Sequence, residues 1–312
     1  MSSLRVVFMG TPDFAVPALQ KISRSHHKVV GVVSQPDRPR GRGQELIPTP
    51  VKKAAQNLNL HPILQPEKLK DPAFLQALQS LNADIFVVVA FRILPELVFS
   101  LPTLGTINLH PSLLPKYRGA APLNWTIING ETESGITIIR ISREIDAGGI
   151  LLQEKSRIFP DETAGSLHDR FSERGAELLL KALDGLESGN LQPLPQNDML
   201  ATPAPKISKE MCRLSFKQPA GQVKNWIHGL SPHPAAFAEL QNIIFKFYRA
   251  EVVSSESVAQ PPGTILSVKN QITVSCSPGV VRILELQRQG KKIMSAEEFL
   301  RGFPLQEGRQ FH

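Results

Sequence analysis

The chain has 312 residues, of which 41% are hydrophobic and 20% charged; this length predicts two domains and this composition is typical of globular proteins. The longest apolar run, residues 85–91, is too short to cross a bilayer, and the first residues lack a signal-peptide pattern, so we expect no membrane association. The two cysteines have no metal-ligand spacing and fit a reducing compartment, so we expect a cytoplasmic protein without a metal.

The net charge is +7, with a pI near 9.5. Residues 209–312 hold 13 of the 35 Lys and Arg but only 8 of the 28 Asp and Glu, so most of the excess lies in the last third. A basic excess on one domain favours a polyanionic partner such as nucleic acid. From charge alone, an ordinary solvated surface is an equally good interpretation.

The first half of the chain alternates between two patterns. Short β-branched runs predict buried parallel strands at residues 6–9, 29–33, 85–89 and 106–109. Helices are predicted to begin where a polar cap precedes a proline, at Thr11-Pro12, Thr49-Pro50 and Asp71-Pro72. The alternation predicts an α/β domain with a mainly parallel sheet.

The second half begins with two predicted strands, 135–141 and 150–158, and a helix over 164–186, which complete a first domain of residues 1–189. A polar, proline-rich stretch then predicts a linker over residues 190–208. The remainder, residues 209–312, is predicted to hold a helix at 220–229 and a capping box at 295–298 that opens a last helix. Short strands are predicted at 236–240, 243–248, 263–268, 272–275 and 280–286, a spacing typical of a small β-barrel.

Two common nucleotide sites are excluded by the glycine pattern. The turn after the first strand has the single glycine Gly10, whereas a dinucleotide site needs G-x-G-x-x-G so that the backbone approaches the pyrophosphate. The chain also contains no P-loop sequence.

Asn108 and His110 alternate with apolar residues at the carboxyl end of a predicted strand, where α/β proteins bind ligands. Asp146 lies at a second transition from strand to loop. An amide, an imidazole and a carboxylate suffice for acyl transfer to an amine, because donors stabilise an oxyanion and a base accepts the amine proton. By spacing alone, a structural Asn–His pair and a turn-capping Asp are the better interpretations.

The stretch at residues 34–53 is long for a connection between a strand and a helix. It carries Arg38, Arg40 and Arg42 between Gly and Pro residues, where guanidinium groups reach phosphates. A solvated basic loop is the alternative.

These motifs together carry a resemblance. The chain resembles the methionyl-tRNA formyltransferases over nearly its whole length, with matches FMGTPDFAVPAL at residues 8–19, QPDRPRGRGQELIPTPVK at 35–52 and INLHPSLLPKYRGAAP at 107–122. The turn at Asp146 and segments 262–265 and 290–294 match as well. The stretch at 107–122 alone specifies only the wider group of folate-dependent formyltransferases.

The resemblance implies a Rossmann-like formyltransferase domain followed by a smaller OB-like barrel. It implies transfer of the formyl group of 10-formyltetrahydrofolate to the amino group of methionyl initiator tRNA, without a covalent enzyme intermediate. The implied catalytic residues are Asn108, His110 and Asp146. The implied folate-binding residues are Phe91, Arg92, Ser112, Leu113, Leu114, Pro115, Tyr117, Arg118, Gly119 and Pro122. The implied tRNA-binding residues are Arg38, Arg40, Arg42, Lys206, Lys209, Lys291 and Lys292, with Arg42 entering the acceptor stem.

The sequence departs from the family in two places. Phe91-Arg92 stands in a segment that is one residue shorter than in relatives, near the expected folate site. Leu214-Ser215-Phe216 replaces the usual I-D-W after a retained K-x-x-K-E. The alternatives are a formyltransferase for a sugar nucleotide or glycinamide ribonucleotide, and a non-catalytic RNA-binding relative. We expect a monomer.

Overall fold

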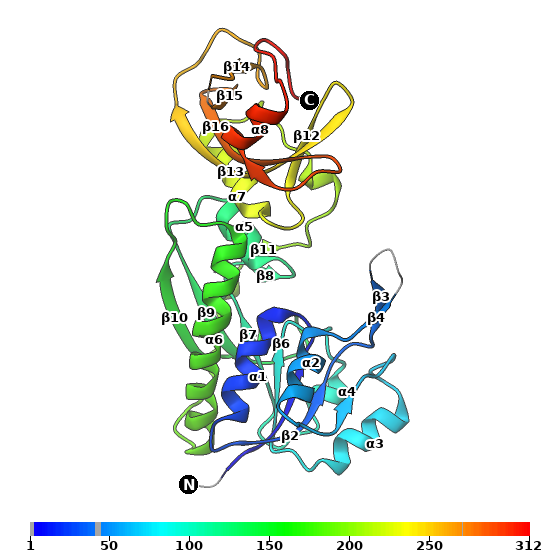
Figure 1. Cartoon of the computed structure of the whole chain (residues 1–312). Helices are drawn as coiled ribbons and strands as arrows, with labels where there is room; N and C mark the ends of the chain where they lie inside the picture. The colour runs from blue at the N-terminus through cyan, green and yellow to red at the C-terminus, as the bar shows by residue number, and fades with distance from the viewer. Residues whose placement is uncertain (1–2, 41–44, 270) are drawn as a thin grey trace. The chain divides into compact units, whose positions relative to one another are not determined.

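The computed structural model describes residues 3–40, 45–269 and 271–312. The chain divides into two compact units (Figure 1). The first unit contains Met1–Gly119, Ser134–Ser156 and His168–Pro203, and the second contains Ala120–Glu133, Arg157–Leu167 and Ala204–His312. The segments Ala120–Glu133 and Arg157–Leu167 of the second unit therefore lie within the range 1–189 predicted for the first domain. The domain boundaries at residues 189 and 208 stay a prediction.

The first unit is built on a seven-stranded sheet with the order β10-β9-β7-β6-β1-β2-β5. Neighbouring strands from β7 to β5 pair in parallel, and β9 runs antiparallel to β7. The strands are β1 (Arg5–Gly10), β2 (Lys28–Val33), β5 (Ile63–Leu64), β6 (Ile85–Val89), β7 (Thr106–His110), β9 (Glu133–Arg140) and β10 (Ile150–Arg157). The predicted mainly parallel sheet is confirmed, and the carboxyl ends of β1, β6 and β7 meet at one edge.

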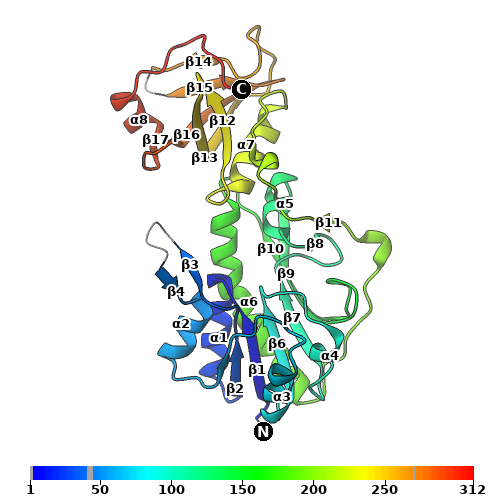
Figure 2. The same cartoon turned by 90° about the vertical axis from the view of Figure 1, so that its right-hand side faces the viewer.

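Helices cover both faces of this sheet (Figure 2). Those on one face are α1 (Val16–Ser23), α2 (Pro50–Asn57) and α6 (Ala164–Glu187), and those on the other are α3 (Pro72–Ser80) and α4 (Glu96–Phe99). On the second face, apolar residues of α3 and α4 pack with β1 and β6 in one buried core. The short 3-10 helices are η1 (Asp13–Ala15) and η2 (Asp198–Leu200).

Two of the three predicted caps of the first half are confirmed. The Thr49 hydroxyl accepts a hydrogen bond from the Lys52 backbone N–H at 3.2 Å, and Asp71 accepts one from Ala73 at 2.8 Å. The prediction at Thr11 is wrong, because Pro12 stands at the cap of η1 without a side-chain hydrogen bond. The Thr11 hydroxyl instead accepts from the backbone N–H of Gln35 at 3.4 Å.

The arginine-rich stretch begins and ends as a short antiparallel hairpin. Its strands are β3 (Arg38–Arg40) and β4 (Glu45–Ile47), and Arg38 pairs with Ile47. The sequence predicted a loop here, since neither three-residue strand is long enough to show periodicity.

The second unit carries an antiparallel sheet with the order β12-β13-β16-β15-β14, with β17 paired to β16. The sheet curls into a partial barrel, and its register shifts in β13 and β14 bend it. Its strands are β12 (Ala236–Leu240), β13 (Ile243–Ser254), β14 (Ile265–Ser267), β15 (Ile272–Ser275), β16 (Val280–Arg288) and β17 (Met294–Ser295). The predicted smaller OB-like β domain is confirmed.

The helices of the second unit are α5 (Pro122–Ile128), α7 (Ala220–Leu230), α8 (Ala296–Gly302) and the 3-10 helix η3 (Glu210–Cys212). The predicted capping box of α8 is confirmed: Ser295 accepts from the Glu298 backbone and the Glu298 side chain accepts from the Ser295 backbone. The core holds Phe216, Phe245 and Phe311, whose rings pack against one another. A short pair, β8 (Arg118–Gly119) with β11 (Pro203–Ala204), completes the strands. No helix in the described part of the chain is long and apolar enough to cross a membrane.

Candidate active site

The end of β7 carries the predicted amide and imidazole. Asn108 and His110 are two residues apart on this strand, so their side chains share one face of the sheet. Asn108 is half-buried, and among the described residues its side-chain amide has no hydrogen-bond partner. His110 is buried, with 4% of its surface exposed. The strand thus presents one available amide beside one enclosed imidazole.

The structure brings Asp146 to His110. Asp146 Oδ2 lies 3.6 Å from Nδ1 of His110, and the other ring nitrogen, Nε2, lies 2.9 Å from the backbone carbonyl oxygen of Tyr117. Because a carbonyl only accepts, Nε2 carries a proton and donates it to Tyr117. Burial lowers the pKa of His110, while the Asp146 charge and the Tyr117 hydrogen bond act in the opposite direction. The neutral ring therefore points its Nδ1 lone pair toward the carboxylate.

Local backbone geometry places the Asp146 carboxylate. Asp146 has a φ of 54°, in the left-handed region that Asp tolerates better than most residues. Two residues later the chain passes so close to β9 that a Cβ on Gly148 would lie 1.7 Å from the Arg140 carbonyl oxygen. Only glycine fits there. Across the site, the backbone N–H of Gly119 donates to Asp146 Oδ2 at 3.0 Å.

Gln196 is a site residue that the sequence reasoning missed. Its side-chain N–H groups donate to the backbone carbonyls of Asp146 at 2.8 Å and Gly148 at 2.7 Å, and its carbonyl accepts from Arg118 at 2.7 Å. The residue therefore ties the Asp146 turn to the loop after His110. Its position in a stretch that resembles a linker offered no signal of this role.

The loop after His110 is held by side chains of the neighbouring strands. Thr137 on β9 donates to the Ser112 carbonyl at 2.6 Å and accepts from the Leu114 N–H at 3.2 Å. Gln153 on β10 donates to the Leu114 carbonyl at 2.9 Å. The Tyr117 N–H donates to the Thr202 hydroxyl at 2.9 Å. The backbone around His110 is therefore ordered by contacts from distant parts of the first unit.

The predicted folate-binding residues occupy several environments. Ser112, Leu114 and Tyr117 are buried, and Leu113, Pro115 and Gly119 are half-buried in the same loop. Pro122 begins α5 in the second unit. The Arg118 guanidinium donates to Gln196 and pairs with Asp198 at 2.6 Å, so it stabilises the site's framework.

Phe91 and Arg92 follow β6, beside the end of β7 in the sheet order. The Arg92 guanidinium lies 5.3 Å from the centre of the Phe91 ring and donates to the carbonyls of Glu67 at 2.9 Å and Pro66 at 2.7 Å. Arg92 is thus held against the loop before α3.

A polar cluster anchors the base of the arginine-rich hairpin. Lys52 Nζ lies 2.5 Å from Asp37 Oδ2 and donates to Gln65 Oε1 at 2.7 Å, and Gln65 donates to Asp37 Oδ1 at 2.8 Å. The hydrogen bond from Lys52 holds the pKa of Asp37 below its usual value. The hairpin therefore leaves the first unit from a fixed base.

The predicted tRNA-binding residues lie in both units. Arg38 is exposed on β3, Arg40 follows on the same strand, and Arg42 lies outside the described residues. Lys206, Lys209, Lys291 and Lys292 are exposed in the second unit. Arg38 and the four lysines are therefore exposed to solvent.

Family models match both parts of the chain. The formyl transferase model matches residues 4–183, and the formyl transferase C-terminal domain model matches residues 206–304. The methionyl-tRNA formyltransferase of Bacteroides fragilis is 44% identical, covering 97% of this chain and 96% of its own. Those of Bacteroides thetaiotaomicron and Geobacter metallireducens are 45% and 44% identical, covering 98% and 99% of this chain and 97% and 98% of theirs.

Solved structures share the fold at lower identity. HypX from Aquifex aeolicus in complex with tetrahydrofolic acid has a TM-score of 0.67 at 18% identity, covering 100% of this chain and 51% of its own. The methionyl-tRNA formyltransferase of Clostridium thermocellum has a TM-score of 0.55 at 16% identity, covering 80% of this chain and 93% of its own. At these identities the likeness supports the fold.

Proposed function

Because the chain belongs to the methionyl-tRNA formyltransferase family, we propose that it transfers the formyl group of 10-formyltetrahydrofolate to the α-amino group of methionyl initiator tRNA. The relatives match this chain across both units, including the C-terminal one. The observation that carries the proposal is the approach of Asp146 to His110 beside the available amide of Asn108. This arrangement supplies the groups that acyl transfer to an amine needs.

The reaction joins the amine nitrogen to the formyl carbon and breaks the bond between that carbon and the folate nitrogen. As the tetrahedral intermediate forms, negative charge develops on the formyl oxygen. We assign the Asn108 amide to donate a hydrogen bond to this oxygen. In comparable sites one such hydrogen bond stabilises the transition state by roughly 3 kcal/mol. The assignment rests on the half-burial of Asn108 at the strand end.

His110 and Asp146 are assigned to handle the proton of the attacking amine. Burial keeps the resting ring neutral, so Nδ1 is free to accept a proton, and that proton would point toward the carboxylate 3.6 Å away. The charged ring would then stabilise the oxyanion, and it would give its proton to the folate nitrogen as the bond between that nitrogen and the formyl carbon breaks. Proton transfer of this kind contributes about 100- to 10,000-fold to rates.

The folate is assigned to the loop that contains Ser112, Leu113, Leu114, Pro115 and Tyr117, together with Phe91, Gly119 and Pro122. Gly119 has no side chain, and its backbone N–H donates to the Asp146 carboxylate. Arg92 and Arg118 have structural partners, and we propose that they border the folate through the loops they hold.

The tRNA is assigned two anchors. Arg38, Arg40 and Arg42 on the hairpin would hold the acceptor end, and Lys206, Lys209, Lys291 and Lys292 would bind phosphates from the second unit. We further propose that the enzyme acts as a monomer in the cytoplasm, without a membrane or a metal in catalysis.

The test is incubation of the purified chain with methionylated initiator tRNA and 10-formyltetrahydrofolate, followed by separation of formylmethionyl-tRNA. A sugar nucleotide and glycinamide ribonucleotide serve as competing acceptors. We expect a formylated product only when the methionylated initiator tRNA is the acceptor. Turnover with another acceptor would support the corresponding alternative, and binding of tRNA without any turnover would indicate a non-catalytic relative.

A further inference from the structure

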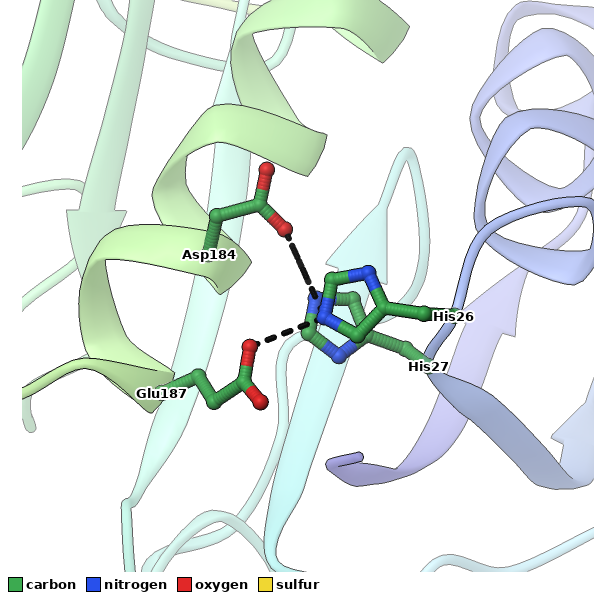
Figure 3. Close-up of side chains that lie close together, drawn as sticks. All are labelled: His26, His27, Asp184 and Glu187. Carbon is green, nitrogen blue, oxygen red and sulfur yellow. Dashed lines mark hydrogen bonds and ion pairs between the residues drawn. The ribbon is translucent and has the colours of Figure 1, made fainter. Parts of the chain in front are cut away.

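Four ionisable side chains meet at the carboxyl end of helix α6 (Figure 3). None of them is among the residues assigned to the reaction. His26 and His27 lie between α1 and β2, and Asp184 and Glu187 lie in the last turn of α6. All four belong to the first unit. One potential ligand atom from each lies within 4.8 Å of the others.

The distances within this cluster are those of a small polar centre. His26 Nε2 lies 2.8 Å from Glu187 Oε2 and 3.9 Å from Asp184 Oδ1. Two ligands of a tetrahedral zinc ion stand about 3.3 Å apart, given bond lengths of about 2.0–2.1 Å. The His26 distances bracket this value, so small side-chain adjustments bring the three atoms onto one ion.

The electrostatics of the cluster favour a cation. The last turn of α6 has no basic side chain, and its terminal carbonyls add partial negative charge to the two carboxylates. The Glu187 side chain is 9% exposed, and its Oε1 is buried without a hydrogen-bond partner. An enclosed carboxylate oxygen of this kind is costly to leave unpaired. His26 and Asp184 are 42% and 49% exposed, which leaves a path from solvent.

His27 differs from His26 in its hydrogen bonds. The Leu4 backbone N–H donates to His27 Nδ1 at 3.4 Å, so in the neutral ring the proton sits on Nε2. Nε2 then donates to Asp184 Oδ1 at 3.1 Å. His27 therefore orients the Asp184 carboxylate and has no lone pair to offer a metal.

We propose that His26, Asp184 and Glu187 bind one divalent transition-metal ion, with Zn²⁺ the best fit, and that His27 is the positioning residue for Asp184. An imidazole nitrogen with two carboxylates suits zinc better than calcium or magnesium, which prefer oxygen ligands alone. Water would complete the coordination. The ion would join the α1–β2 turn to the end of α6, a structural role separate from formyl transfer.

The test uses the full chain without an affinity tag, stripped with chelator and titrated with Zn²⁺ by calorimetry and with Co²⁺ by visible absorption. We expect uptake of one equivalent and a rise in melting temperature with Zn²⁺. His26→Gln and Glu187→Gln should each weaken binding at least about tenfold. No stoichiometric uptake by the unsubstituted chain would overturn the proposal.

The matched control is Glu177→Gln. Glu177 also lies on α6 and forms an ion pair with Lys21 of α1, so its loss removes a contact between the same two helices without removing a ligand. Its metal binding should equal that of the unsubstituted chain, and an equal loss in Glu177→Gln and Glu187→Gln would overturn the site. His27→Gln keeps a side-chain donor for Asp184 and should weaken binding less than His26→Gln; a larger loss would contradict its positioning role.

Discussion

The side-chain amide of Gln196 donates a hydrogen bond of 2.8 Å to the backbone carbonyl of Asp146, a residue 50 positions earlier in the chain. The same amide group also donates to the backbone carbonyl of Gly148, and the side-chain carbonyl of Gln196 accepts from the Arg118 guanidinium. One side chain therefore joins the turn that carries the candidate carboxylate to the loop that follows the candidate imidazole. The position of Asp146 depends on a segment that looks like a linker.

Gln196→Ala should lower the turnover number for formylation about 10- to 100-fold, because the Asp146 turn loses both of its side-chain anchors and a small displacement of a catalytic group has effects of this size. The KM for tRNA should change little, since the side-chain partners of Gln196 are Arg118, Asp146 and Gly148, none of which is a predicted tRNA-binding residue. Steady-state kinetics measure both. Asn197→Ala, which removes only the cap of η2, is the control and should keep near-normal turnover. Equal losses in both variants would indicate general destabilisation of the segment.

His110→Ala and Asp146→Asn should each reduce turnover at least about 100-fold with little change in tRNA affinity. The first removes the proton acceptor. The second keeps an oxygen for the Gly119 N–H but removes the charge that raises the pKa of His110, so protonation of the ring becomes harder. Single-turnover rates and filter binding separate chemistry from binding. Near-normal turnover in either variant would refute the role of that residue.

Arg42→Ala should lower kcat/KM for initiator tRNA at least about tenfold while leaving folate binding unchanged, since a charged contact to phosphate is worth roughly 1.5–3 kcal/mol. The dependence of kcat/KM on salt should become less steep. Lys53→Ala, an exposed residue of α2 with the same charge, is the matched control. If folate binding falls as much as tRNA formylation, Arg42 does not read the tRNA.

His228 makes stability depend on pH in a defined window. Burial, with the Lys224 charge adding to it, lowers the pKa of His228 to about 4, and Nε2 accepts a hydrogen bond from the Ala250 N–H at 3.1 Å. The unfolded chain takes up this proton near pH 6.5, so stability is complete above that value and falls by about 3 kcal/mol as the pH drops to about 4.

Urea unfolding between pH 4 and 7 measures this loss. In His228→Gln the free energy of unfolding should be lower at pH 7, but it should change less between pH 4 and pH 7 than in the unsubstituted chain. His233→Gln, at an exposed position of the same unit, should leave the slope unchanged. A slope that persists in His228→Gln would show that other groups cause it.

Local signals predicted most of the elements because they act within a few residues. Thr49, Asp71 and Ser295 cap helices as expected, since each hydroxyl or carboxylate meets a backbone N–H two or three residues ahead. Helix α5 was not predicted, because its cap position is Ala121, which forms no side-chain hydrogen bond. The Thr11 hydroxyl instead accepts from the backbone N–H of Gln35, a contact with a different part of the chain that no local signal predicts.

By itself, the sequence determined the alternation of strands and helices and the basic excess, and its motifs marked Asn108, His110 and Asp146 as candidate catalytic residues, because periodicity, composition and motifs are local properties. Only the tertiary structure decided that the His110 ring is enclosed between Tyr117 and Asp146, and that Gln196 holds the turn. It also brought His26 to Glu187 across 161 positions. Contacts of this kind join residues that are far apart in the sequence and meet only in the folded chain. Burial then sets the protonation state of the ionisable groups.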